Sequence, residues 1–182
     1  MGLAVAAPAQ MPVSDAPVRK PEIRLIDPEK DAIALARIER VRSRLPEKYR
    51  RRHNFAWAVA KIEGLEKAEY FAHSGIQSLG DVSAEAAQNV DGISLRKKKG
   101  GRFEVLCVNH DDEIEGEDCW PRNMDTEYKI AEDLASRLAD PSAPGRVRLY
   151  TDLYPCASCR HVMEQFLAVY TNVQMQVLYR EK

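Results

Sequence analysis

Residues 146–179 read RVRLYTDLYPCASCRHVMEQFLAVYTNVQMQVLY, and the fold of the chain is decided here. Apolar and polar residues alternate over 146–150 and again over 173–179, which is the period of a half-buried β-strand. Between them, residues 155–170 repeat apolar side chains at helical spacing. The inward-facing set of this predicted helix is Val162, Met163, Phe166 and Val169. A strand, a helix and a second strand in succession predict neighbouring strands joined by a helix that covers the sheet.

Another helix precedes this unit. It begins at Asp125 or Thr126, both of which are good N-cap residues, and the turn-forming residues 140–145 end it. Its apolar face consists of Ile130, Ala131, Leu134 and Leu138. The helix therefore has one side that can pack on a sheet.

In the middle of the chain, the sequence pattern changes to a period of two residues, which is typical of a β-strand. Residues 54–62 and 69–76 alternate on either side of a turn, which predicts a β-hairpin, and residues 102–109 are a further strand candidate. The pattern over 77–95 does not distinguish helix from strand. Together the elements predict an α/β fold of three layers, in which helices flank a mixed central sheet of four to five strands.

The amino-terminal part has a different composition. Residues 1–27 are rich in Ala and Pro and predict a linker, so the folded domain is expected over 28–182. Within it we expect a basic helical segment over 28–53 and the core of the domain over 54–182. The helix repeats apolar residues at Ala34, Ile38, Val41 and Leu45. The run Arg50-Arg51-Arg52-His53 follows, and these charges form either a solvated face or a contact for phosphates.

The overall charge of the chain is balanced. Its 182 residues are enough for one well-packed domain, and 27 Lys and Arg against 28 Asp and Glu give a net charge of −1. This balance excludes a protein that binds nucleic acid through a strongly basic total charge. It hides an asymmetry, because residues 1–54 carry a net charge of +5 and the remainder −6. A run of about 18 apolar residues and a signal-peptide pattern are both absent, so no membrane partner is expected.

The strongest chemical signal is Pro155-Cys156-Ala157-Ser158-Cys159, where a strand gives way to a helix. Both sulfurs lie in the first helical turn, where free amides and the helix dipole favour thiolates, so the pair can hold a soft cation such as Zn²⁺. A redox dithiol and a chance occurrence remain as alternatives. The other cysteines, Cys107 and Cys119, stand singly and receive no role. Two thiolates and one further ligand leave an open position for water, as in catalytic zinc sites.

A carboxylate stands in the first turn of the preceding helix, in Thr126-Glu127-Tyr128-Lys129. Together with Pro155-Cys156-x-x-Cys159, it resembles the zinc-dependent nucleic-acid and nucleotide deaminase superfamily, whose signature is H-x-E followed by P-C-x-x-C. The resemblance implies a cytidine deaminase-like fold in which Cys156 and Cys159 bind zinc and Glu127 shuttles protons. With the added element Ala72-His73-Ser74-Gly75, the chain over residues 54–179 is similar to deaminase domains carried at the C-termini of bacterial polymorphic toxins.

The sequence departs from the superfamily pattern two residues before Glu127, where Asp125 replaces the usual His or Cys. Asp125 can bind zinc through a carboxylate oxygen. The other candidate is His73, at the end of the second hairpin strand, which a deaminase-like fold brings close to the start of the Glu127 helix. We favour His73 as the third ligand, because neutral imidazole is the commoner partner of two thiolates.

The resemblance implies a zinc-dependent cytosine deaminase that acts on DNA or RNA, and of the two we expect DNA. It also implies a toxin domain that is secreted, acts in the cytoplasm of a target cell and has a cognate immunity protein as partner; we expect a monomer. Ser74, Asn109 and Trp57 are the expected substrate contacts. The basic amino-terminal segment and Lys97-Lys98-Lys99 can follow a strand whose bases stack on Trp57 or Trp120. A free cytidine or nucleotide deaminase, a non-catalytic zinc-binding module and a redox dithiol protein remain as alternatives.

Overall fold

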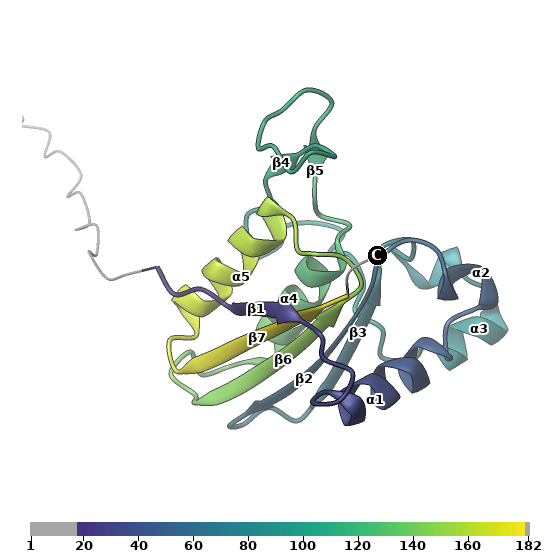
Figure 1. Cartoon of the computed structure of the whole chain (residues 1–182), viewed down its shortest axis with the longest axis horizontal. Helices are drawn as coiled ribbons and strands as arrows, with labels where there is room; N and C mark the ends of the chain where they lie inside the picture. The colour runs from purple at the N-terminus through teal and green to yellow at the C-terminus, as the bar shows by residue number, and fades with distance from the viewer. Residues whose placement is uncertain (1–17, 181–182) are drawn as a thin grey trace, which may run out of the picture.

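A five-stranded mixed sheet lies at the centre of the protein (Figure 1). The structure is a computed structural model that describes residues 18–180. The strands of the sheet are β1 (Glu22–Leu25), β2 (Phe55–Ile62), β3 (Glu69–His73), β6 (Gly145–Thr151) and β7 (Val173–Tyr179). They lie in the order β1-β7-β6-β2-β3, where β1, β7 and β6 are parallel and β2 is antiparallel to both of its neighbours. The predicted mixed sheet of an α/β fold is confirmed.

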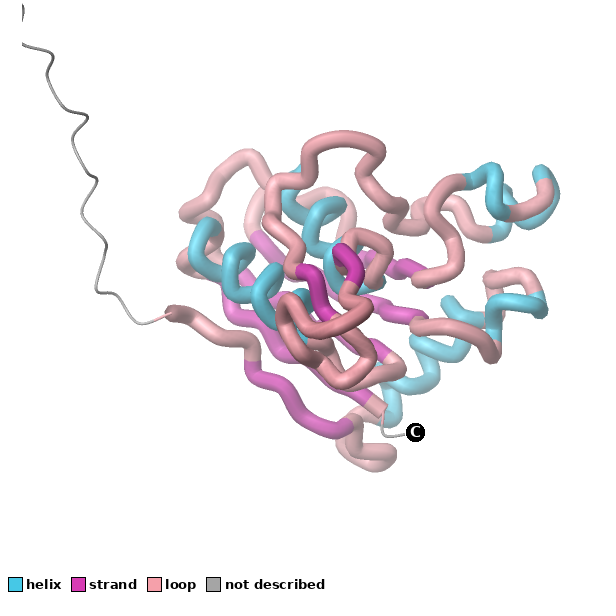
Figure 2. The backbone as a smooth tube through the Cα atoms, turned by 90° about the horizontal axis from the view of Figure 1, so that it is seen from above, coloured by secondary structure: helices cyan, strands magenta, loops and turns pink. Residues whose placement is uncertain are grey.

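Helices cover both faces of this sheet and complete three layers (Figures 1 and 2). The helices are α1 (Ala32–Arg42), α2 (Glu47–Arg50), α3 (Ala84–Asn89), α4 (Thr126–Arg137) and α5 (Ala157–Val169), with a 3₁₀ turn η1 (Leu79–Asp81). Successive side chains of β2 point to opposite faces of the sheet and so contact both helical layers. Ala56 and Ala58 pack with α4 and α5, whereas Phe55 and Trp57 pack with α1. Whether a residue stands at an odd or an even position along the strand therefore decides which helical layer its side chain contacts.

The predicted strand, helix and strand of residues 146–179 are present as β6, α5 and β7, and the two strands are parallel neighbours. The predicted apolar face of α4 is buried throughout. On α5, Val162, Met163 and Phe166 are buried as predicted. Val169 was expected to face inward and is instead 40% exposed, because it is the last residue of the helix.

The expected linker over residues 1–27 contains the edge strand of the sheet. Residues 22–25 form β1 and pair in parallel with residues 176–179 of β7. This pairing satisfies backbone groups of β7 that would otherwise form an open edge. The domain boundary predicted at residue 28 is therefore wrong, since the folded part includes β1. Residues 1–17, the remainder of that expectation, lie outside the described part of the chain.

The basic segment over 28–53 forms two helices where one was expected. Helix α1 ends at Arg42, and Pro46 is the N-cap residue of the short helix α2. Proline has no N–H group and cannot continue the hydrogen-bond pattern of α1. The predicted apolar positions of the segment are all buried.

The predicted strand over 102–109 is reduced to β4 (Cys107–Val108), which pairs with β5 (Trp120–Pro121) in a projecting hairpin (Figure 1). A disulfide between Cys107 and Cys119 closes this hairpin. The ambiguous stretch over 77–95 contains η1 and α3. Among residues 18–180, no helix combines the length and the apolar character needed to cross a bilayer.

Candidate active site

The N-termini of α4 and α5 meet at one spot, where three potential metal ligands converge. Asp125 is the N-cap residue of α4, Cys156 is the N-cap residue of α5, and Cys159 lies in the first turn of α5. The Asp125 carboxylate makes no capping hydrogen bond; its Oδ2 instead lies 3.3 Å from the Sγ atoms of both cysteines, which are 3.3 Å apart. Within the described part of the chain, these are the residues whose ligand atoms come close enough together to share a metal ion.

This donor set fits Zn²⁺. Thiolates and carboxylates bind zinc at about 2.0 to 2.3 Å, so atoms 3.3 Å from one another can share one ion. Hydrogen bonding to Cys156, followed by burial, raises the pKa of the Cys159 thiol well above its usual value, and the charges of Glu127 and Asp125 act in the same direction. A bound divalent cation reverses this effect, because it stabilises the anionic form of each ligand. Three protein ligands leave a fourth position open, as in catalytic zinc sites.

Glu127 lies beside this group in the first turn of α4. Its side chain is buried, and its Oε2 is 3.5 Å from Cys159 Sγ. Burial, followed by the charge of Asp125, raises the pKa of the Glu127 carboxyl. A carboxyl group with a raised pKa accepts a proton more readily than a free one, which suits a group that must take up and pass on a proton in general acid–base catalysis.

A chain of hydrogen bonds orients Glu127. Thr126 Oγ1 donates to Glu127 Oε2 at 2.8 Å, and Asn54 Nδ2 donates to the Oγ1 atoms of Thr126 and Thr151 at 2.8 and 2.9 Å. The Oδ1 of Asn54 accepts the backbone N–H of Leu153 at 3.2 Å. Asn54 and Thr151 were not predicted as site residues from the sequence. The signal available was their position, since Asn54 directly precedes β2 and Thr151 is the last residue of β6.

A cavity of about 500 Å³ opens over the candidate metal-binding group, which consists of Asp125, Cys156 and Cys159. The remaining residues that line it are His53, Asn54, Ser74, Asn109, His110, Asp112, Trp120, Arg122, Leu153 and Tyr154. The Arg122 guanidinium lies 3.9 Å from the centroid of the Trp120 ring, and the His110 ring meets Trp120 edge-on at 4.7 Å. Trp120, which was expected to stack on bases, is half-buried and lines the cavity.

His73 does not join the metal-binding group. Its ring is fully buried, and Nε2 lies 2.9 Å from the carbonyl oxygens of both Tyr49 and Arg52, so Nε2 carries a proton. Nδ1 accepts the backbone N–H of Gly75 at 3.1 Å, which leaves no lone pair for a metal. Burial lowers the pKa of His73 and keeps the ring neutral. The preference for His73 over Asp125 is therefore corrected: Asp125 lies with the thiols, and His73 holds the segment before β2.

Strand alternation explains this placement and also removes Trp57 from the cavity. Trp57 on β2 is paired with Phe71 on β3, and both side chains pack in the layer of α1. His73 stands two residues after Phe71 and shares its face. Trp57 is buried and donates from Nε1 to Glu69 Oε1 at 2.9 Å, so its role here is structural.

The other two expected substrate contacts line the cavity. Ser74 Oγ accepts the backbone N–H of Asn54 at 3.0 Å. Asn109 Oδ1 accepts the backbone N–H groups of Asp111 and Glu113 at 3.0 and 2.9 Å. Both side chains therefore hold the backbone that forms the cavity wall.

Of the two basic segments, the amino-terminal one reaches the cavity. His53, at the end of the arginine run, is among its lining residues. Lys97, from the other basic segment, lines a separate cavity with Lys67 and Asp133 beside the second half of α4. The Lys97 segment is therefore not part of the wall over the metal-binding group.

Comparison with known proteins gives one family. A family model described as Toxin-deaminase, the BURPS668_1122 family of deaminases, matches residues 38–181, which include all of the cavity-lining residues. No curated protein and no solved structure gives a significant match. Because the family match covers most of the chain, the protein belongs to this family of toxin deaminases, within the cytidine deaminase-like superfamily.

Proposed function

We propose that this deaminase is zinc-dependent and converts cytosine to uracil in nucleic acid, in DNA rather than RNA. The observation that carries the proposal is the buried Glu127 carboxylate beside Asp125, Cys156 and Cys159. A proton-shuttling glutamate next to a metal-binding group is the combination needed for hydrolytic removal of an amino group from a base. Asp125 is proposed as the third zinc ligand in place of His73.

The reaction needs two proton transfers, and we assign both to Glu127. Asp125, Cys156 and Cys159 would hold Zn²⁺, which would supply a water molecule of lowered pKa. The Glu127 carboxylate takes a proton from the attacking water molecule and passes it to N3 of cytosine while the water oxygen bonds to C4. Glu127 next moves the proton of the new C4 hydroxyl to the amino group; the C4–N bond breaks, ammonia leaves and a carbonyl remains. Thr126 holds the carboxylate in position throughout.

The cavity suits one base with its sugar. Its volume of about 500 Å³ lies within the range of small-molecule sites. Trp120 offers an aromatic surface at the wall for the base. A cytosine inside a duplex cannot enter such a cavity, so the substrate is a single strand or a flipped base.

In its biological setting, the domain is secreted by the producing bacterium and deaminates nucleic acid in the cytoplasm of a target cell. The family match supports the toxin role. A producing cell must protect its own nucleic acid from this activity, so we propose a cognate immunity protein that binds the domain. The enzyme acts as a monomer.

Sequencing after expression tests the reaction and the substrate. In a host that lacks uracil-DNA repair, the wild type should cause genome-wide C-to-T changes, and Glu127→Gln should cause none. Changes confined to transcripts would refute the DNA preference. Deamination of free cytidine without changes in either polymer would refute the nucleic-acid substrate, and the absence of any deamination would refute the proposed reaction.

Zinc content tests the ligand assignment independently of activity. Purified Glu127→Gln and His73→Asn proteins should keep about one zinc per chain by atomic absorption, whereas Asp125→Ala should lose it. The His73→Asn variant serves as the matched control. Zinc loss in His73→Asn with retention in Asp125→Ala would reverse the assignment.

A further inference from the structure

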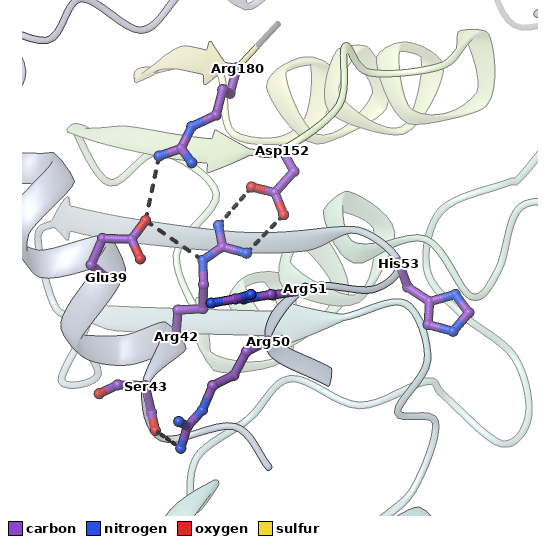
Figure 3. Close-up of a pocket in the computed structure, with 8 residues that line it drawn as sticks. All are labelled: Glu39, Arg42, Ser43, Arg50, Arg51, His53, Asp152 and Arg180. Carbon is purple, nitrogen blue, oxygen red and sulfur yellow. Dashed lines mark hydrogen bonds and ion pairs between the residues drawn. The ribbon is translucent and has the colours of Figure 1, made fainter. Parts of the chain in front are cut away.

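A second cavity, of about 400 Å³, adjoins the catalytic one on the side of α1 (Figure 3). The residues that line it include Arg42, Arg50, Arg51, His53, Asp152 and Arg180. His53 lines both cavities. The two cavities are therefore neighbours that share His53 as part of their walls.

Two of the arginines are neutralised by acidic partners. Arg42 forms a two-pronged ion pair with Asp152, with N–O distances of 2.9 and 2.6 Å. Arg180 lies 3.4 Å from Glu39 (Figure 3). These pairs form one wall of the second cavity and contribute little net charge to it.

The other two arginines keep their positive charge. The exposed Arg50 donates to the carbonyl oxygens of Leu45 and Ser43 at 2.8 and 2.9 Å, which orients its guanidinium without neutralising it. The exposed Arg51 has no hydrogen bond or ion pair with any residue that the structure describes, and Figure 3 shows its side chain at the cavity. The cavity therefore presents two uncompensated guanidinium groups, the side chains best suited to bind phosphate oxygens.

The segment that carries these charges is held at both ends. Arg50 is tied to the backbone between α1 and α2, and Asn54 is tied to Thr126 and Thr151 at the catalytic cavity. Between them, His53 adopts a left-handed backbone with φ of 62°, a strained conformation for a non-glycine residue. The distance from the arginines to the catalytic cavity is therefore set by the fold.

Another rim of the catalytic cavity has the opposite charge. The β4–β5 loop carries six acidic residues within residues 111–118. Asp112 from this loop lines the catalytic cavity and is paired with Arg160 at 2.9 Å, so the net acidic charge of the loop comes from its other five acidic residues. A phosphodiester chain is repelled from this loop and attracted to the arginine side.

We infer that the second cavity binds the backbone phosphates of a single nucleic-acid strand next to the cytosine in the catalytic cavity, with Arg51 and Arg50 as the phosphate contacts. The inference rests on the proposed function and adds the direction in which the strand leaves the active site. Base-independent phosphate contacts of this kind hold a strand in register and make its affinity depend on salt.

Binding to an inactive variant tests the inference without catalysis. A fluorescein-labelled single-stranded DNA with one cytosine is titrated into Glu127→Gln and into the same protein with Arg51→Glu added. The added change should weaken binding by about tenfold or more, and Arg51→Lys should restore most of it. Arg51→Ala should lower the slope of log affinity against log salt by about 0.7.

A matched control separates the site from overall charge. Arg146 is exposed at the opposite end of β6 from the catalytic cavity, and Arg146→Glu makes the same charge change as Arg51→Glu. Affinity should change less than about twofold in the control. Equal weakening by both substitutions, or no effect of Arg51→Glu, would overturn the inference.

Activity measurements keep the two proposals apart. Arg51→Glu should raise KM for the oligonucleotide by about tenfold and change kcat by less than about twofold. Deamination of the oligonucleotide with an unchanged KM would overturn the inference while the proposed function stands. Binding that depends on Arg51, without deamination by the wild type, would refute the proposed function and leave the phosphate site in place.

Discussion

The ion pair between Arg42 and Asp152 connects α1 to the end of β6, close to both cavities. The two guanidinium-to-carboxylate contacts measure 2.9 and 2.6 Å, and the side chains are 13% and 7% exposed. Asp152 also accepts from Tyr150 OH at 2.7 Å and from the backbone N–H of Phe55 at 3.3 Å. Removal of Asp152 would leave the buried Arg42 with a longer contact of 3.8 Å to Glu39, and removal of Arg42 would leave Asp152 without its cationic partner, so the two substitutions should be strongly coupled.

The magnitude follows from the burial of each partner. Breaking a buried pair costs about 3 to 5 kcal/mol, and the slight exposure of Arg42 puts Asp152→Asn near 3 kcal/mol. Arg42→Met leaves Asp152 with its other two donors and should cost about 2 kcal/mol. The double variant removes both charges together and should cost about 3 kcal/mol, which corresponds to a coupling of about 2 kcal/mol.

Urea unfolding at pH 7, followed by tryptophan fluorescence, measures all four free energies of unfolding. Burial opposes ionisation of Asp152, but Arg42 outweighs it and lowers the pKa of the carboxyl. The coupling should therefore be complete above about pH 4 and decline as the pH falls further. Additive effects of the two substitutions at pH 7 would refute the reasoning.

A second ion pair on the same helix provides the control. Arg37 contacts Glu69 with two bonds of 2.6 Å, but the side chains are 45% and 24% exposed. Solvent screens such a pair, so its coupling should stay below about 1 kcal/mol. Equal coupling in both pairs would show that burial does not set the difference.

Three further predictions concern stability. Hydrogen bonds from Arg24 lower the pKa of Asp31 to about 2. Above about pH 4 the wild type should therefore be more stable than Asp31→Asn by about 1 to 2 kcal/mol, a figure reduced to allow for solvent screening at Arg24. In thermal unfolding scans this difference in stability should vanish toward pH 2. Burial lowers the pKa of Lys129 to about 7, so above that pH the folded state binds fewer protons than the unfolded state. In urea titrations from pH 7 to 9, the free energy of unfolding of the wild type should therefore rise by on the order of 1 kcal/mol per pH unit relative to Lys129→Met. Parallel pH profiles of the two proteins would contradict this. Replacement of Cys107 and Cys119 by Ser should destabilise the protein by about 1 to 3 kcal/mol and speed amide exchange in the β4–β5 hairpin, whereas unchanged exchange would show that the disulfide does not hold the hairpin.

Local patterns were sufficient for the second half of the chain. The apolar spacing of α4, β6, α5 and β7 predicted each element, because each presents a regularly spaced apolar face to the core that these four elements share. Glu127 and the pair Cys156 and Cys159 could be recognised for a related reason. Each lies in the first turn or cap of a predicted helix, and an α/β fold brings such helix starts to one edge of the sheet.

The third residue of the metal-binding group could not be chosen from local patterns. His73 and Asp125 are both chemically suitable, and the choice depends on the face of β3 from which His73 projects. Because side chains alternate along a strand, His73 and Trp57 project into the layer of α1, away from the helix starts that carry the thiols. The period-two pattern shows that the faces differ, but it does not show which face receives which helices.

The contacts between distant segments also could not be predicted from the sequence. Strand β1 is short and lies in a Pro-rich segment, and it is ordered by pairing with β7 at the other end of the chain. The disulfide depends on the hairpin that brings Cys107 and Cys119 together. Neither feature leaves a periodic signal of its own.

By itself, the sequence determined the α/β class, the helix starts that carry Glu127 and the two thiols, and the basic charge of the segment before β2. These properties depend on residue type and on spacing within one element. Only the tertiary structure decided that Asp125 joins the thiols, that His73 is a buried structural residue, and that Arg50 and Arg51 border a cavity next to the one over Asp125 and the thiols. Such properties depend on which faces of which elements meet, and packing over the whole chain sets that arrangement.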